Sequence, residues 1–158
     1  MRCVKGFTLI ELIFVILLLS IIGIVLLPQW TASSLSLEFE ARRVLSDIRY
    51  VQALSMMSGQ RYRFVKLSST SYQLTNESGT AVLLPSGVTQ ITLPTGMTIG
   101  SLSNLPNNLV AFDSQGSPYV NTTLPGTALS STAIIPLSMG SQTRSIQITS
   151  ETGYGALQ

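Results

Sequence analysis

A continuous run of 21 residues near the start of the chain, residues 7–27, carries almost only apolar side chains. A helix of about that length crosses the hydrocarbon core of a bilayer, which is roughly 30 Å thick. The remainder of the 158 residues is rich in Ser, Thr and Gly and is typical of a soluble domain. The sequence therefore predicts a transmembrane helix over residues 7–28 and one small globular domain over residues 29–158.

The formal net charge of +2 is located ahead of this run, at Arg2 and Lys5, because residues 7–158 contain as many acidic as basic side chains. Basic residues that flank an apolar segment remain on the cytoplasmic side of the membrane. We therefore expect a single-pass protein with a cytoplasmic N-terminus and an extracytoplasmic domain. The neutral remainder gives no general indication of nucleic acid or an acidic surface as a partner.

Several kinds of chemistry are excluded from the expected domain by its composition. The chain has no histidine, and its single cysteine, Cys3, precedes the apolar run. Zinc sites built from Cys or His, histidine-based triads and internal disulfides therefore cannot form there. The carboxylates show no catalytic pairing, and Asp113 is predicted to cap a turn rather than to bind calcium. We expect no enzyme activity, no cofactor and no metal.

Three interpretations compete for the N-terminal segment. A cleaved secretory signal has an apolar core of about 7–15 residues and small residues at the cut; residues 32–34, Ala-Ser-Ser, fit such a cut, but the run is too long. A plain membrane anchor explains the length but not Glu11. A charge near mid-bilayer costs about 3 kcal/mol, and intramembrane ionisable groups are functional candidates. Glu11 lies near the end of the span, so its cost is smaller, but it still requires a partner.

The third interpretation supplies that partner. Residues 5–12, Lys-Gly-Phe-Thr-Leu-Ile-Glu-Leu, closely resemble the processing motif of type IV prepilins and type II secretion pseudopilins. In that family a prepilin peptidase cuts after the glycine, on the cytoplasmic face of the bacterial inner membrane, and methylates the new N-terminal residue. The resemblance implies a leader over residues 1–6, cleavage between Gly6 and Phe7, and N-methylation of Phe7. It also implies assembly with other pilins or pseudopilins into an extracytoplasmic filament.

Two further positions follow from this resemblance. Glu11 is the fifth residue after the cut, where the family keeps a glutamate, and the new amine of Phe7 on a neighbouring subunit can neutralise it in a place too apolar for either charge alone. Pro28 corresponds to a proline that often kinks the helix in family members, since proline removes one backbone hydrogen bond. Pro28 can equally mark the membrane boundary, and the two interpretations are compatible.

The remaining residues alternate between helical and strand patterns. Residues 36–58 carry apolar side chains at helical spacing, with Gly59 as a stop, and the stripe comprises Leu37, Ala41, Val44, Ile48 and Val51. Strands are predicted over residues 61–67, 88–93 and 109–112, with hairpins over 72–84 and 132–149. The predicted fold class is α+β and pilin-like. A long N-terminal helix, half transmembrane and half amphipathic to about residue 58, packs on a small antiparallel sheet.

A looser resemblance lies near the C-terminus. Phe112-Asp113 followed by Gly116, then residues 144–148, Arg-Ser-Ile-Gln-Ile, and Thr152-Gly153 resemble the pattern of H-type minor pseudopilins and FimT-like minor pilins. The resemblance implies a minor structural subunit of a type IV pilus or type II secretion pseudopilus, involved in filament assembly or protein secretion.

One basic cluster suggests an alternative function. It comprises Arg61, Arg63 and Lys66, interleaved with Tyr62 and Phe64. Charge beside aromatic rings can bind single-stranded nucleic acid, and some FimT-like minor pilins bind DNA during natural transformation. Those members carry arginines just after the final glycine, whereas Tyr154 and Gly155 follow here. We therefore favour the alternative of solvated charges on one strand face with the aromatic rings in the core, and do not expect nucleic acid as a partner.

Overall fold

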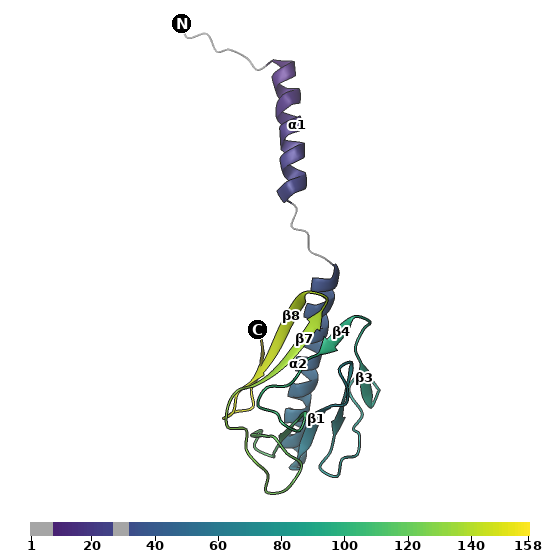
Figure 1. Ribbon diagram of the computed structural model, residues 1–158, viewed down its shortest axis with the longest axis vertical. Coiled ribbons are helices and arrows are strands. Elements are labelled where there is room, and N and C mark those ends of the chain that lie inside the picture. The colour runs from purple at the N-terminus through teal and green to yellow at the C-terminus, as the bar shows by residue number, and fades with distance from the viewer. Residues whose placement is uncertain (1–7, 27–31) are drawn as a thin grey trace. The chain divides into compact units, whose positions relative to one another are not determined.

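The computed structural model describes residues 8–26 and 32–158. The chain divides into two compact units, Met1–Thr31 and Ala32–Gln158. The first contains helix α1, Leu9–Leu26, and the second contains helix α2, Ala32–Ser58, and the strands β1 to β9 (Figure 1). We describe each unit by itself.

Helix α1 consists almost entirely of apolar residues. The side chains described for it, residues 9–20, are all exposed. The hydroxyl of Ser20 donates to the carbonyl of Ile16 at 2.8 Å, so the polar group is satisfied within the helix. Among the described residues, no helix is both long and apolar enough to cross a membrane. The membrane helix expected over residues 7–28 extends beyond the described ranges.

Helix α2 is the central element of the second unit, and strands of both sheets contact it. Every residue of the predicted stripe is buried, and Ile48 near its middle is only 1% exposed. The helix ends at Ser58, one residue before Gly59, whose φ of 68° favours glycine. The amide of Gly59 donates to the carbonyl of Ser55 at 3.1 Å. The apolar periodicity and the stop residue thus predicted this helix and its end.

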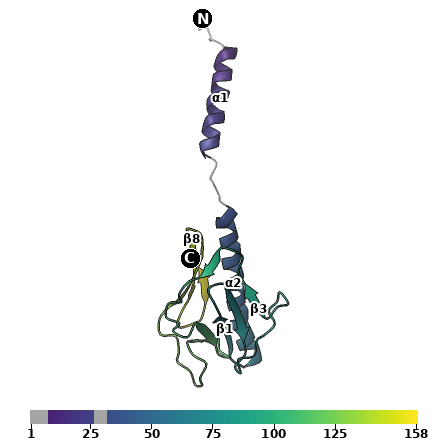
Figure 2. The same cartoon turned by 45° about the vertical axis from the view of Figure 1, so that its right-hand side comes forward.

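Two antiparallel sheets pack against α2. The first has the strand order β3-β2-β1-β5-β6, with bounds β1 Tyr62–Lys66, β2 Ser71–Thr75, β3 Gln90–Thr92, β5 Leu109–Phe112 and β6 Pro118–Tyr119. The second has the order β4-β7-β8-β9, with bounds β4 Met97–Ile99, β7 Ala133–Met139, β8 Gln142–Ile148 and β9 Gly155–Leu157. Helix α2 contacts strands of both sheets, including β1 and β8, and lies beside them in both views (Figures 1 and 2).

The core of the second unit lies where α2 meets the two sheets. The rings of Phe64 and Tyr72, from the first sheet, lie 5.0 Å apart between centroids, and both side chains are fully buried. Ile135 and Ile146, which face each other across the β7–β8 hairpin, contribute the second sheet. The apolar stripe of α2 is covered by both sheets, so this one helix face contributes to the packing of both. The α+β prediction is confirmed.

The hairpin predicted over residues 72–84 is wrong in its second half. Residues 81–84 form no strand, and only an isolated bridge joins Ala81 to Thr75. The reason is that both edges of β2 are already occupied, by β1 on one side and by β3 on the other. The strands β4, β6 and β9, of two or three residues each, were not predicted.

Candidate functional site

The predicted processing and assembly residues fall partly outside the described residues. Gly6, Phe7 and Pro28 lie there, so their predicted roles remain predictions. Glu11 is described and lies in the first turn of α1, where it is exposed. A carboxylate in the first turn is favourable because it faces the positive end of the helix dipole.

Thr8 gives α1 a defined beginning. The amide of Glu11 approaches the carbonyl of Thr8 at 3.1 Å and its hydroxyl at 3.4 Å, and the amide of Leu12 donates to the same carbonyl at 3.2 Å. A threonine three residues before a glutamate is the pattern of a capped helix N-terminus. The cap therefore fixes Glu11 on the first turn, among the exposed apolar residues Ile10, Leu12 and Ile13. The site is a single carboxylate surrounded by apolar side chains that no other described residue of this unit covers.

The basic cluster of β1 has a structural role in the domain. Arg61 and Arg63 are 7% and 5% exposed, and Lys66 is half-buried. The guanidinium of Arg61 donates to the carbonyls of Thr123 at 3.2 Å and Pro125 at 3.0 Å. The expectation of solvated charges is therefore wrong for the two arginines, although Phe64 does lie in the core as predicted.

The other two members of the cluster are also bound to backbone. Arg63 donates to the carbonyls of Glu77 and Thr122, and the Lys66 ammonium donates to the carbonyl of Gly100 at 2.6 Å. All three cations thus bind backbone carbonyls of loops from other parts of the domain. The structure gives no support to the alternative of DNA binding through this cluster, because its charges are already used inside the domain. The alternation of residues along the strand could not predict that these cations are bound by carbonyls, since the loops that supply the carbonyls come from distant parts of the sequence.

Two parts of the C-terminal pattern, the turns that contain Gly116 and Gly153, come together around one side chain of α2. The amide nitrogen Nε2 of Gln52 donates to the carbonyls of Gly116 and Thr152, each at 2.9 Å. Gly153 has a φ of 66°, and a Cβ there would lie 2.6 Å from the carbonyl oxygen of Gly116. The two glycine-containing turns therefore touch each other and α2, which explains why a loose pattern spread over 40 residues contains glycines at these places. Gln52 was missed because its only sequence signal is a polar residue on an amphipathic helix.

Asp113 caps a turn, as predicted. Its carboxylate oxygen Oδ1 accepts from the amides of Gln115 and Ser117, both at 2.9 Å. Its other oxygen accepts from the hydroxyl of Tyr119 at 3.2 Å. Both oxygens of the carboxylate therefore accept hydrogen bonds from the turn and its flanking residues, and these bonds close the turn.

Two acidic residues on α2 lie in opposite environments. Asp47 is buried, and its Oδ2 accepts from the hydroxyl of Tyr72 at 2.6 Å. Burial raises the pKa of Asp47, against the opposing effects of Tyr72 and of the nearby Arg43. Burial also raises the pKa of Tyr72. By contrast, Arg144 and Arg42 hold the pKa of Glu38 below its ordinary value through bonds of 2.9 and 2.7 Å.

Comparison with known proteins agrees with this geometry. Residues 1–27 match the family described as the prokaryotic N-terminal methylation motif. No curated protein sequence matches the chain significantly. The match covers the segment in which Gly6, Phe7 and Glu11 lie.

Solved structures align with about three quarters of the chain. The type IV minor pilin FimU of Pseudomonas aeruginosa aligns with a TM-score of 0.54 at 11% identity, over 77% of this chain and 92% of FimU. The minor pseudopilin EpsH of the type 2 secretion system of Vibrio cholerae aligns with a TM-score of 0.58 at 12% identity, over 78% of this chain and 96% of EpsH. At such identities the likeness shows the fold, which is that of type IV pilin-like proteins. The chain thus combines an N-terminal methylation motif over residues 1–27 with a domain of the fold that FimU and EpsH share.

Proposed function

We propose that this chain is a minor pilin or pseudopilin, a structural subunit of a type IV pilus or a type II secretion pseudopilus that takes part in filament assembly or protein secretion. The observation that carries this proposal is the union of a methylation motif over residues 1–27 with a pilin-like domain in one chain. FimU is a minor pilin and EpsH a minor pseudopilin. The C-terminal pattern around Gln52 favours the H-type and FimT-like minor subunits, and a structural subunit needs no catalytic residues.

Processing by a prepilin peptidase is the first step of this function. The enzyme cuts between Gly6 and Phe7 and methylates Phe7, and residues 7–28 remain in the bacterial inner membrane as a single-pass helix. The N-terminus lies on the cytoplasmic side and the domain on the extracytoplasmic side. The pair of basic residues ahead of the apolar run, Arg2 and Lys5, supports this orientation. The exposed apolar side chains of residues 9–20 support insertion, because no other described residue of their unit covers them.

Assembly then joins α1 to the same segment of other subunits. Once the leader is removed, the amine of Phe7 on one subunit pairs with the carboxylate of Glu11 on its neighbour. Glu11 is suited to this because the Thr8 cap holds it in the first turn, among apolar side chains that cannot solvate a charge. The amine exists only after cleavage, so processing and assembly are coupled.

The intact mass of the protein extracted from membranes, and from sheared filaments, tests this proposal. We expect the mature chain to lack residues 1–6 and to carry one added methyl group. The variant Gly6→Leu, as a control, should keep its leader and stay out of filaments. A mature start at or beyond Ser33 would instead demonstrate secretory processing and overturn the proposal.

A further inference from the structure

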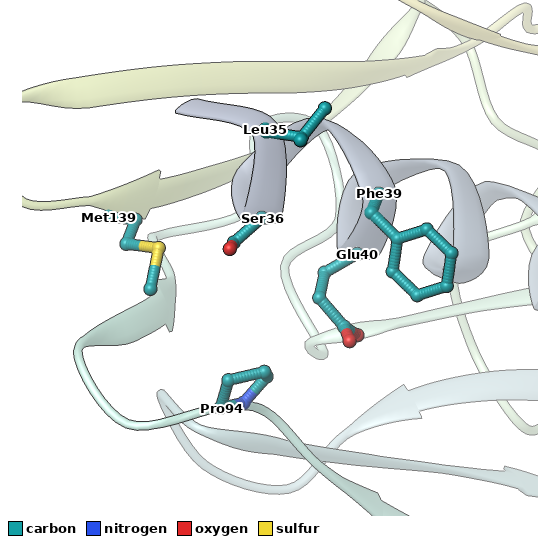
Figure 3. A pocket seen from close by; sticks show the side chains of 6 residues that line it. All are labelled: Leu35, Ser36, Phe39, Glu40, Pro94 and Met139. Atoms are coloured by element: carbon teal, nitrogen blue, oxygen red, sulfur yellow. The ribbon is translucent and has the colours of Figure 1, made fainter. Parts of the chain in front are cut away.

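Two cavities of similar size on the second unit differ in how the charges beside them are paired. The first is an apolar groove of about 480 Å³ beside the first turns of α2, where Phe39 and Glu40 lie on the helix above Pro94 (Figure 3). The carboxylate of Glu40 in its wall is already paired with Arg43 at 3.2 Å. The second cavity, of about 450 Å³, adjoins two arginines that have no such partner among the described residues.

This second cavity, the loop pocket, lies where two loop segments meet beside the start of β1. Its lining residues are Gln60, Asn76, Glu77, Ser78 and Leu124. Arg61 donates to two carbonyls of the segment 121–127. Arg63 donates to one carbonyl of that segment and to one of the turn at residues 76–80. Both guanidinium groups therefore lie immediately behind the walls of the loop pocket.

The two arginines are buried cations without a counter-charge. Arg61 and Arg63 are only 7% and 5% exposed, and neither forms an ion pair with a carboxylate of the described residues. Their carbonyl partners are uncharged, whereas buried charges in proteins are normally paired. Burial lowers the pKa of Arg63, the charge of Glu77 raises it, and the charge of Arg61 lowers it again. The two cations therefore repel each other behind the pocket wall.

Three groups that can donate a hydrogen bond lie unpaired at the same place. Among the described residues, the Nε atoms of both arginines and the hydroxyl of Thr75 are buried without a hydrogen-bond partner. Thr75 lies directly opposite Arg63 in the register of β1 and β2, so their side chains share a face of the sheet. Buried donors in proteins are almost always satisfied. A ligand that satisfies all three groups must accept hydrogen bonds, and a negative charge on it would also balance the two cations.

The walls of the loop pocket favour a carboxylate over other anions. A planar guanidinium binds a carboxylate through two parallel hydrogen bonds. A phosphate group carries more charge at neutral pH, so the carboxylate of Glu77 in the wall repels it more strongly. A nucleic-acid backbone binds to accessible cations, whereas these two are buried. Leu124 is 64% exposed at the same wall and offers an apolar contact beside the charge.

We propose that the loop pocket binds an acidic side chain of a partner protein, a glutamate or aspartate next to an apolar residue, with Arg61 and Arg63 as its counter-charges. A guanidinium has five N–H donors, and the carbonyl bonds of these two arginines leave donors free on each. The carboxylate accepts from these donors, and its apolar neighbour packs on Leu124. This contact does not involve α1, so the inference goes beyond the proposed function.

Titration of the full chain in detergent with short peptides tests this inference. The probe is the acetylated and amidated tripeptide Leu-Glu-Leu, and Leu-Gln-Leu is its matched control, since it has the same shape without the charge. In nitrogen-15 NMR spectra, we expect the Glu peptide to shift the arginine Nε–H signals that are lost on substitution of Arg61 or Arg63. The Gln peptide should bind about tenfold more weakly. No shift with the Glu peptide, or equal binding of the two peptides, would overturn the inference.

Two charge variants separate a local effect from a general one. Glu77→Gln removes the carboxylate in the pocket wall but keeps the carbonyl that binds Arg63, so it should bind the Glu peptide about threefold more tightly. Glu151→Gln makes the same change of charge at an exposed residue that does not line the pocket, and should leave the affinity unchanged. Equal effects of the two variants would overturn the inference.

Two further variants test the donors. Arg63→Lys keeps the charge but loses the planar group, and should weaken binding of the Glu peptide about tenfold. Because Arg63 also holds two loop segments, Thr75→Val is the second variant. It removes only an unpartnered hydroxyl, and should weaken binding about threefold without lowering the melting temperature. Wild-type affinity of the Thr75 variant, together with wild-type affinity of a folded Arg63 variant, would overturn the inference.

Other anions test the chemical class of the ligand. Acetate should bind more weakly than the Glu peptide, because it has no apolar side chain to pack on Leu124. Equal affinity for acetate would show that a free carboxylate, and not a side chain of a partner, is the ligand. Tighter binding of inorganic phosphate or of a single-stranded oligonucleotide than of the Glu peptide would overturn the assignment to a carboxylate.

Discussion

Helix α1 and helix α2 are both rich in apolar residues, but among the described residues only α2 is covered by other elements of its own unit. The apolar stripe of α2 is covered by two sheets, and Ala41 and Val44 have no exposed surface. The described side chains of α1 are exposed along its whole circumference. Apolar surface of this kind is stable only when something removes it from water.

This difference indicates what stabilises each of the two units. The second unit contains its own core and holds its internal charges with backbone carbonyls, as Arg61 and Arg63 show. In the described part of the first unit, α1 has a capped beginning at Thr8 and one charged side chain, Glu11, and its apolar side chains form no core. If the proposed function is right, changes in α1 should alter assembly, whereas changes in α2 should alter the folding of the domain.

The largest expected effect is on assembly, from Glu11→Val. The variant should insert and should still be cut after Gly6, because the residues that flank the cut are unchanged. It should fail to enter filaments, since a buried amine of Phe7 without its carboxylate carries a penalty of about 3–5 kcal/mol. The measurement is the amount of subunit in sheared filaments relative to the membrane. Wild-type levels of the variant in filaments would mean that Glu11 is only a tolerated anchor residue.

The same substitution in the two helices tests the comparison directly. Ile48→Ala should lower the free energy of unfolding of the domain by about 3 kcal/mol, because it leaves a cavity in a closed core. Ile13→Ala, in the full chain in detergent, should leave the melting of the domain unchanged, since Ile13 belongs to the other unit. Circular dichroism at increasing temperature measures both. A comparable loss from Ile13→Ala would show that α1 contributes to the stability of the domain.

Local patterns predicted the parts of the fold that depend on local periodicity. The helix with its end at Ser58, the strand over residues 109–112 and the β7–β8 hairpin all follow from spacing and turn residues, and they are confirmed. The assembly residues were suggested by a short motif, and the family match covers that segment. The roles of Gly6, Phe7 and Glu11 remain predictions, because they depend on an enzyme and on neighbouring subunits.

Long-range partners could not be predicted. From the sequence, Arg61 is expected to be a solvated charge beside a strand. In the structure it is bound by the carbonyls of Thr123 and Pro125, which lie about sixty residues further along the chain. Asp47 reads as a surface residue until Tyr72 meets it. In each case the polar group is buried against a partner whose position depends on the whole topology, and hydrophobic spacing carries no information about it.

Substitutions at two glycines of the domain distinguish the cost of backbone strain from the cost of a steric clash. Gly153→Ala should lower the free energy of unfolding by about 2 kcal/mol or more, because an αL backbone disfavours a Cβ and this Cβ would meet the carbonyl of Gly116 at 2.6 Å. Gly140→Ala is the matched control, with a φ of 59° but nothing within 4 Å of its Cβ. It should lose only about 1 kcal/mol. Equal losses in chemical denaturation would contradict the packing of the two turns on Gln52.

The smallest effects concern pH, and they compare a buried with an exposed carboxylate on α2. Burial raises the pKa of Asp47, so the folded domain holds this proton more tightly than the unfolded chain. Its contribution to stability is therefore complete below the ordinary aspartate pKa and is lost as pH rises through the raised pKa of the folded state. Asp47→Asn keeps an acceptor for Tyr72 but cannot ionise. The melting temperature of the wild type minus that of the variant should fall between about pH 3 and pH 7.

Glu38 should show the opposite slope. Arg144 and Arg42 lower its pKa, so its contribution is present above the ordinary glutamate pKa and is lost as pH falls through the lowered pKa of the folded state. The melting temperature of the wild type minus that of Glu38→Gln should therefore rise over the same pH interval, and added salt should weaken this slope because the pair is exposed. Salt should affect the Asp47 slope less, since Asp47 is buried. Slopes of the same sign for the two variants would contradict the assignment of burial as the dominant effect at Asp47. Burial is the largest effect that opposes ionisation there, the charge of Glu40 adds to it, and Tyr72 and Arg43 act against both.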